Sequence, residues 1–124
     1  SIKKRNPQVE ELNIGYAFAL RNSSIAYAEI GELDKAFIMV EDLIKLNDEH
    51  DDIELKGELA RALSNATTTI LSHPEIKAGG SMIQKFFSRL VALYEKESSR
   101  KIHGAYQIAK TNLKRSKSFS GLVS

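Results

Sequence analysis

The side chains best suited to chemistry in this sequence are three histidines and many serines. His50, His73 and His103 stand far apart, and none has a His or Cys at the spacing of metal ligands. Cysteine is absent, which excludes disulfides, thiol catalysis and cysteine-based zinc sites. No serine has His and Asp partners that spacing would nominate, and nothing in the pattern indicates the buried ionisable groups that catalysis usually needs. We therefore expect a protein that is not an enzyme and that holds neither a metal nor a cofactor.

Two short segments have a composition that could hold ions. The acidic run 47–52 would need a glycine sixth and an acid twelfth, counted from Asp48, to form a calcium loop, but Ile53 and Leu59 stand there. We interpret it as a turn between helices. The segment 79–81, Gly-Gly-Ser, opens a predicted helix whose free N–H groups could hold an anion. No strand precedes it and the phosphate-loop pattern is missing, so a hinge with a helix cap is the favoured interpretation.

The charge is distributed unevenly along the chain. Residues 32–58 carry ten acids and three bases, whereas residues 95–124 carry seven bases and two acids. The basic segment could contact phosphates of a nucleic acid, but such proteins are usually basic overall and have aromatic side chains within the basic patch. Docking of this segment on an acidic protein surface is the favoured interpretation, and nucleic-acid binding is the alternative. The candidate basic patch consists of Arg100, Lys101, Lys110, Lys114 and Arg115.

Length and composition indicate one small domain. The chain has 124 residues, of which 42% are apolar, enough for a buried core in a single domain. No apolar run approaches the roughly 20 residues of a membrane span. The absence of cysteine fits a reducing compartment, so we expect a cytoplasmic protein. We expect the domain to cover residues 1–115 and a flexible Ser/Lys-rich tail to cover 116–124.

Helical periodicity runs through the sequence, and alternating β-branched runs are missing. Asn6 followed by Pro7 predicts a helix start, and Gly31 predicts its end. The third helix is expected to begin with a capping box of Asp51 and Glu54, and the fourth to begin at Ser81. The sequence therefore predicts an all-α fold with about five helices, at about 7–30, 33–46, 51–72, 81–94 and 99–115. The pattern weakens near residues 21–24, so the first segment is either one long helix or two short ones.

The fourth predicted helix has the broadest apolar surface. Between Met82 and Tyr94, large apolar side chains cover more than one face. Such a helix is either buried in the centre of the domain or shared with a second chain. Central burial is favoured, and a homo-oligomer formed through residues 82–94 is the alternative.

The segment 20–47 carries a pattern typical of a tight helical hairpin. Leu20, Ser24 and Tyr27 place a bulky, a small and an aromatic residue along one helix, and Gly31 supplies the turn. Ala36 is small where the second helix must approach the first, and larger apolar residues follow at Val40, Leu43 and Leu46. This segment resembles the tetratricopeptide repeat, although Asp48 stands where that family has its closing proline. Beyond residue 50 the match weakens, and the remainder is either a divergent repeat or a generic helical bundle.

The resemblance implies a fold and a function. It implies antiparallel hairpins stacked into a short right-handed superhelix, and a scaffold or adaptor that binds a peptide or protein segment. In that family the first helix of each repeat lines the binding groove, so Phe18 and Ile25 would be apolar anchors. The partner-binding residues that the resemblance implies are Phe18, Arg21, Asn22, Ile25 and Glu29.

Overall fold

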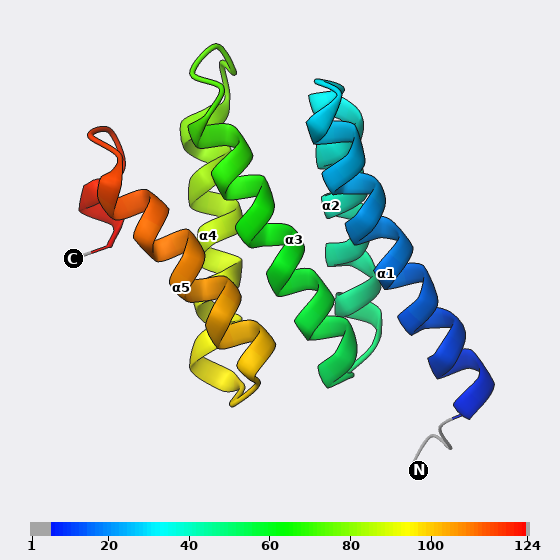
Figure 1. Cartoon of the computed structure of the whole chain (residues 1–124). Coiled ribbons are helices and arrows are strands. Elements are labelled where there is room, and N and C mark those ends of the chain that lie inside the picture. Colours follow the sequence, from blue (N-terminus) through cyan, green and yellow to red (C-terminus); the bar gives the residue numbers. More distant parts are fainter. Residues whose placement is uncertain (1–5, 124) are drawn as a thin grey trace.

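The computed structural model describes residues 6–123 and confirms the all-α fold. Throughout this range the chain forms helices and turns without a β-strand. No helix among the described residues combines the length and the apolar character that crossing a membrane requires. The elements are α1 (Pro7–Glu29), α2 (Leu33–Glu49), α3 (Ile53–Leu71), α4 (Gly79–Lys96), α5 (Arg100–Arg115) and a 3-10 turn, η1 (Ser120–Leu122) (Figure 1).

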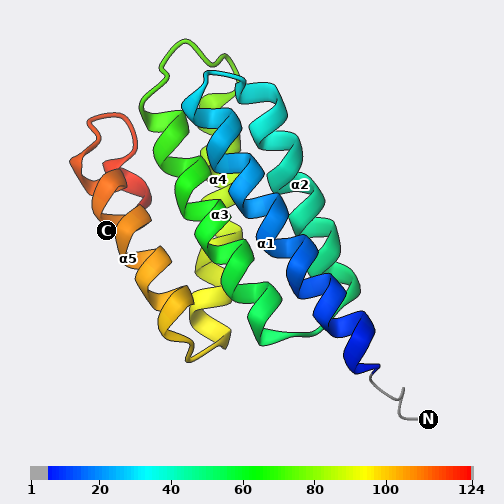
Figure 2. The ribbon, with the colours of Figure 1, turned by 45° about the vertical axis from the view of Figure 1, so that its right-hand side comes forward.

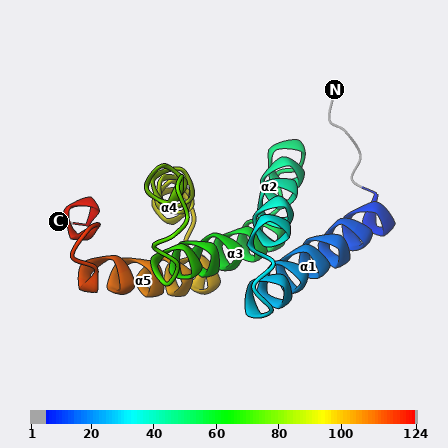
Figure 3. The same cartoon turned by 90° about the horizontal axis from the view of Figure 1, so that it is seen from above.

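The five helices form two layers. Seen from above, α1, α3 and α5 lie in one row, and α2 and α4 both lie on the same side of that row (Figure 3). Consecutive helices run in opposite directions, so α1 with α2 and α3 with α4 form hairpins, and α5 follows at the end of the row (Figures 1 and 2). The helix α3 packs against all four others, which makes it the centre of the molecule.

The composition of α3 explains its central place. Small residues let neighbouring helices approach it closely, and leucines fill the space between them. The hydroxyl of Thr67 is fully buried, but it donates a 2.9 Å hydrogen bond to the Leu63 carbonyl and so remains satisfied. The buried residues of α3 are Leu55, Gly57, Glu58, Leu59, Ala60, Ala62, Leu63, Ser64, Ala66, Thr67 and Ile70.

Local signals determine both ends of α1 as predicted. The Asn6 side chain accepts hydrogen bonds from the Gln8 and Val9 amides, and Pro7 occupies the first helical turn. Gly31 has a φ of +81°, a conformation that other residues rarely adopt, and it turns the chain into α2. The helix is continuous between these ends. Ala36 is buried where α2 begins to pack on its neighbours, as the hairpin pattern predicted.

The cap predicted for the third helix lies one residue too early. Asp52, rather than Asp51, accepts hydrogen bonds from the amides of Glu54 and Leu55. Asp51 instead accepts a 2.7 Å hydrogen bond from Lys56. Aspartate favours the N-cap position at either residue, although only Asp51 has a glutamate three residues later, and the path of the α2–α3 turn decides which carboxylate faces the free amides.

The fourth helix begins at Gly79 rather than at Ser81. The Ser81 hydroxyl donates to the Ala78 carbonyl at 3.1 Å, so it does not cap the helix as predicted. Gly79 is buried, and a Cβ atom there would lie 3.2 Å from Cγ2 of Ile70. The first glycine therefore allows the start of α4 to approach the end of α3, and the glycine pair forms the first helical turn.

Burial within the domain accounts for the broad apolar surface of α4. Ile83, Phe86, Phe87 and Leu90 are buried, and the Phe87 ring stacks on Tyr106 of α5 at 5.9 Å between centroids. A homo-oligomer through residues 82–94 stays a prediction, but most of the large side chains that suggested it are covered by the chain itself.

Residues 116–123 fold back beside α5. Phe119 packs on the edge of the core, and Val123 is 8% exposed. Phe119 and Val123 thus pack residues 116–123 against the core. The flexibility expected for residues 116–124 stays a prediction.

Lys56 joins the start of α3 to the turn before α5. Its ammonium donates to carboxylate oxygens of Asp51 and Glu97, each at 2.7 Å. The hydrogen bond to Asp51, followed by that to Glu97, raises the pKa of Lys56 above its ordinary value of 10.5. The raised pKa means that this contribution to stability is complete below pH 10.5 and is lost as the pH rises through the pKa of the folded state.

Replacing Lys56 with methionine should therefore lower stability by about 1 kcal/mol or less at neutral pH, since the pair is partly exposed. Urea unfolding followed by circular dichroism, repeated from about pH 8 to about pH 11, measures the difference between parent and variant. The difference should shrink toward the alkaline end. A difference that stays constant over the series would contradict the assignment.

Candidate functional site

A hollow of about 420 Å³ opens on the layer formed by α1, α3 and α5. Three of its lining residues are cationic, several are uncharged polar residues, and none is acidic. We call this hollow the groove. Its lining residues are Ile25 from α1, then Arg61, Ser64, Asn65 and Thr68 from α3, and Arg100, Lys101, Gly104, Ala105, Ile108 and Asn112 from α5.

The floor of the groove is a polar stripe on α3. Arg61, Asn65 and Thr68 follow one another at spacings of four and three, which places them on one face of the helix. The opposite wall comes from α5, and the Asn112 amide donates a 2.9 Å hydrogen bond to the Thr68 hydroxyl. This hydrogen bond joins α5 to α3 and fixes the separation of the two helices at that end of the groove.

Two guanidinium groups in the groove are free to meet a ligand. Arg61 and Arg100 are exposed, and among the described residues neither has an acidic partner within 4 Å. The ammonium of Lys101 is less free, since it lies 3.8 Å from a Glu54 oxygen and 3.9 Å from a Glu58 oxygen. The groove therefore presents an excess of positive charge.

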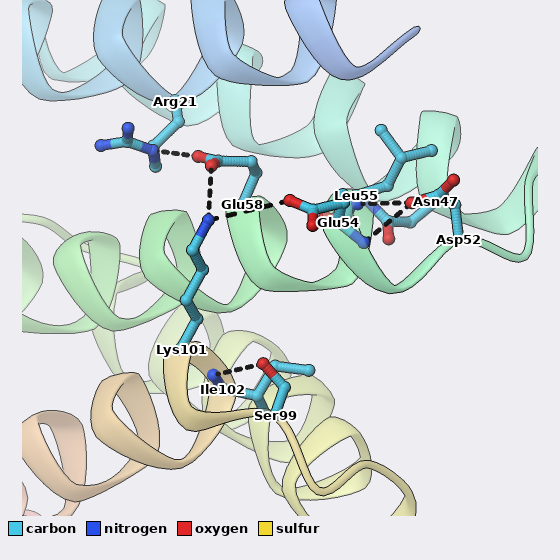
Figure 4. A network of polar contacts seen from close by, with 9 residues as sticks. All are labelled: Arg21, Asn47, Asp52, Glu54, Leu55, Glu58, Ser99, Lys101 and Ile102. Carbon is cyan, nitrogen blue, oxygen red and sulfur yellow. Dashed lines mark hydrogen bonds and ion pairs between the residues drawn. The ribbon is translucent and has the colours of Figure 1, made fainter. Parts of the chain in front are cut away.

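Beside the groove, Arg21 forms an ion pair with Glu58. The Glu58 side chain is 7% exposed and that of Arg21 13%, and the Arg21 Nε donates to a Glu58 oxygen. Figure 4 shows Arg21 of α1 and Lys101 of α5 reaching the same Glu58 carboxylate of α3 from two sides. A single buried carboxylate thus joins all three helices of the row.

The structure places the five residues implied by the family resemblance in different surroundings. Ile25 lines the groove, and Glu29 lines an adjoining hollow of about 240 Å³ together with Ile25. Phe18 is exposed, and its ring lies 5.0 Å from the Arg21 guanidinium carbon. Asn22 is exposed on α1 but lines neither hollow. Arg21 forms an ion pair with Glu58, so its side chain joins α1 to α3 and stabilises the fold.

The five residues of the predicted basic patch divide between two places. Arg100 and Lys101 belong to the groove. Lys114 and Arg115 are exposed in the last turn of α5, where cations interact favourably with the helix dipole. The Lys110 ammonium lies 5.7 Å from the centre of the Tyr106 ring. All five lie on the half of α5 that is turned away from the core.

Sequence reasoning missed Arg61, Asn65 and Asn112 as site residues. The available signal was the polar stripe at helical spacing on α3, which is otherwise the most deeply buried helix of the domain. Such a stripe predicts that one side of the helix faces solvent. It does not show which other helix lies opposite that side.

The three histidines take part in local contacts. A His50 nitrogen lies 3.4 Å from the Asn13 amide nitrogen, and His73 contacts Glu75 at 2.8 Å. A His103 ring nitrogen lies 2.9 Å from the Glu97 carbonyl. Over residues 6–123, no three His, Asp or Glu side chains come together in a way that could hold a metal ion.

A second cavity, of about 530 Å³, lies on the other layer, between α2 and the start of α4. Its lining is mainly apolar, with Leu33, Phe37 and Ile38 from α2 facing Ile76 and Met82. Ile38 is half exposed at its rim. The cavity lacks the converging cations of the groove.

Comparison of the chain with protein-family models, with curated proteins and with solved structures gives no match. Any functional assignment therefore depends on the geometry and charge of the groove.

Proposed function

We propose that this chain is a non-catalytic adaptor that binds an acidic segment of another protein in the groove between α1, α3 and α5. One observation carries this proposal: the groove has three cationic side chains and no acidic one in its lining, although the chain as a whole is nearly neutral. Two of these cations lack an acidic partner in the part of the chain that the structure describes.

The groups in the groove suit a peptide. Guanidinium groups form paired, charge-assisted hydrogen bonds with carboxylates, so Arg61 and Arg100 would hold acidic side chains. Asn65 can donate and accept, which suits a peptide backbone. Ile25 and Ile108 offer apolar surface on opposite walls, where a large side chain between two acids would find its anchor.

We include in this proposal a relationship with tetratricopeptide-like repeats, and the two-layer arrangement supports it. In this chain, as in that family, alternate helices form one row and the intervening helices back it. The groove lies on the row of alternate helices, which is where the resemblance implied a binding surface.

Reversing the charge of one groove residue should weaken binding without changing the stability of the fold. We expect Arg61→Glu to weaken binding of a labelled acidic peptide at least tenfold, which is about 1.4 kcal/mol, because an attraction becomes a repulsion. The probe is a fluorescent peptide of about 12 residues that alternates glutamate with leucine, measured by anisotropy at about 50 mM salt. Arg61 is exposed, so the stability of the variant should match that of the parent.

Lys77→Glu is the matched control, since it makes the same charge change at an exposed position outside the groove. It should bind the probe almost as the parent does. The proposal is wrong if the parent and Arg61→Glu bind the acidic peptide with equal affinity. It is also wrong if the parent binds a lysine–leucine peptide of the same length as tightly as the acidic one.

Nucleic-acid binding is the second candidate, and the solvent half of α5 favours it. Five cations stand there, and three of them lie outside the groove. Phosphate binding would show a steep fall in affinity with salt and a loss on Lys114→Glu/Arg115→Glu, with Arg61→Glu having less effect. A labelled single-stranded oligonucleotide measured beside the acidic peptide distinguishes the two functions, because the peptide should respond to Arg61→Glu and the oligonucleotide to Lys114→Glu/Arg115→Glu.

A further inference from the structure

The outer side of α1 carries an apolar seam that no part of the described chain covers. Successive members are separated by three and four residues in strict alternation, which is the spacing of a helix that packs along a second helix. We call these residues the α1 seam; they are Val9, Leu12, Tyr16, Ala19, Ser23, Ala26 and Ile30.

Six of the seven members of the α1 seam are exposed, and Ser23 is partly buried. Leu12 is 73% exposed, Ile30 72%, Tyr16 51% and Val9 47%, and Ala19 and Ala26 are exposed too. The residues that α1 buries, Ala17, Leu20 and Ser24, belong to a different side of the helix. Single exposed apolar residues are ordinary, but a continuous row along a whole helix marks an interaction surface.

The side-chain sizes along the seam suit a partner helix. Large residues stand toward the two ends, at Leu12, Tyr16 and Ile30, and small ones stand between them, at Ala19, Ser23 and Ala26. Small residues let a second backbone come close, and the large ones then pack beside it.

Charge indicates what that partner is. The α1–α2 hairpin, residues 7–49, carries nine acids, six of them on α2 and the turn before it, and three bases, a net −6, whereas α4 and α5, residues 79–115, carry two acids and eight bases, a net +6. The helices α1 and α5 lie at opposite ends of the row (Figure 3). The two ends of this molecule therefore have opposite charge. Near the seam stand three acids, Glu11, Glu29 and Glu32, all exposed.

The exposed side of α5 complements the seam. Arg100, Gly104, Ile108, Thr111 and Arg115 follow at spacings of four or three, so they share one face of the helix. This face has a small residue and an apolar one at its centre and cations at both ends. It can meet the α1 seam with apolar contacts in the middle and with opposite charges around them.

We propose that a second copy of this chain occupies the α1 seam, with the exposed face of its α5 packed against α1, so that copies join head to tail. A two-fold pairing of α1 with α1 would instead bring two acidic ends together. A head-to-tail contact leaves one free end on each copy, so the assembly grows with concentration rather than closing at a dimer. The α1 seam is not part of the groove, so this inference does not rest on the proposed function. Arg100, Gly104 and Ile108 of the α5 face also line the groove, so a second copy docked there would compete with a groove ligand.

Sedimentation velocity of the 124-residue chain tests the proposal at about 10 to about 300 µM protein, in about 50 mM and about 500 mM salt. At low salt the average sedimentation coefficient should keep rising with concentration, and at high salt it should fall toward that of a monomer. Leu12→Glu/Tyr16→Glu removes the α1 face, and Lys114→Glu/Arg115→Glu removes the α5 charge. Each should shift self-association at least tenfold toward monomer.

A mixture of these two variants gives the sharpest result. The seam variant keeps a working α5 face, and the α5 variant keeps a working seam. Mixed in equal amounts, they should form a one-to-one pair and nothing larger, although each alone stays monomeric. Only a contact between two different faces gives this result.

Matched controls keep the outcome specific. Ile38→Glu changes an equally exposed apolar residue away from the seam, and Lys77→Glu/Lys96→Glu makes the same charge change as the α5 variant at exposed positions outside α5. Both should assemble as the parent does. The circular dichroism of every variant should remain that of the parent.

A chain that stays monomeric at every concentration in low salt would overturn the proposal and leave the seam to a different protein. A closed dimer that strengthens with salt and ignores the α5 variant would overturn it in favour of two-fold pairing through α1.

Discussion

Replacement of Arg21 by glutamate should lower the free energy of unfolding by about 3–5 kcal/mol, the cost of breaking a buried ion pair. Glu58 is 5% exposed, and Arg21 is the cation that bonds it directly. The substitution leaves one buried carboxylate unpaired and places a second beside it. Lys101, at 3.9 Å and with a side chain that is 44% exposed, cannot compensate for both.

Urea unfolding followed by circular dichroism measures this effect. Arg61→Glu is its control, because it makes the same substitution at an exposed groove residue and should change stability by about 0.5 kcal/mol or less. The pair Arg21→Gln and Glu58→Gln, alone and combined, isolates the interaction: the double variant should lose less than the two single losses together. Strict additivity of the two losses would show that the ion pair contributes nothing of its own.

Replacement of Phe86 by alanine should lower the free energy of unfolding by about 3–5 kcal/mol as well. Phe86 is 1% exposed on α4, and its ring lies 6.3 Å from that of Phe37 on α2. Removing it opens a cavity between α2 and α4, and both helices are also packed against α3, so the site cannot collapse easily.

Phe18→Ala is the matched control for this second experiment. Phe18 is half exposed and its main neighbour is the Arg21 guanidinium, so its loss should cost about 1 kcal/mol or less. Similar losses at Phe86 and Phe18 in urea unfolding would mean that α2 and α4 do not pack as the structure has them.

Together these two substitutions probe how the groove is held. The Arg21–Glu58 pair fixes α1 to α3, and Phe86 belongs to the layer that backs both. Lysine and arginine side chains that face a ligand gain from such a rigid base, since less order remains to be imposed on binding. Loss of acidic-peptide binding in Arg21→Glu would therefore follow from a displaced helix rather than from a lost ligand contact.

Much of the secondary structure is determined by the sequence alone, because its signals act between neighbours. Asn6 and Pro7 start α1 and Gly31 ends it through bonds that span only a few residues. The apolar spacing likewise identified each helix and the hairpin between Leu20 and Leu46. The sequence failed where two neighbours both favour the N-cap position, as Asp51 and Asp52 do, and where a tertiary contact decides, as Ile70 does for Gly79.

The candidate site and the assembly face depend on tertiary structure. Arg61, Arg100 and Asn112 come from two helices, and their convergence follows from the packing of α5 on α3. Arg21 looked like a ligand contact until α3 placed Glu58 beside it, 37 positions further along the chain. On α1, helical spacing places Leu12 and Leu20 in one apolar face, but the structure buries Leu20 and leaves Leu12 73% exposed. Only the position of the neighbouring helices decides that Leu20 becomes core and Leu12 remains exposed, because burial is a property of the whole packed arrangement and helical spacing is a property of one segment.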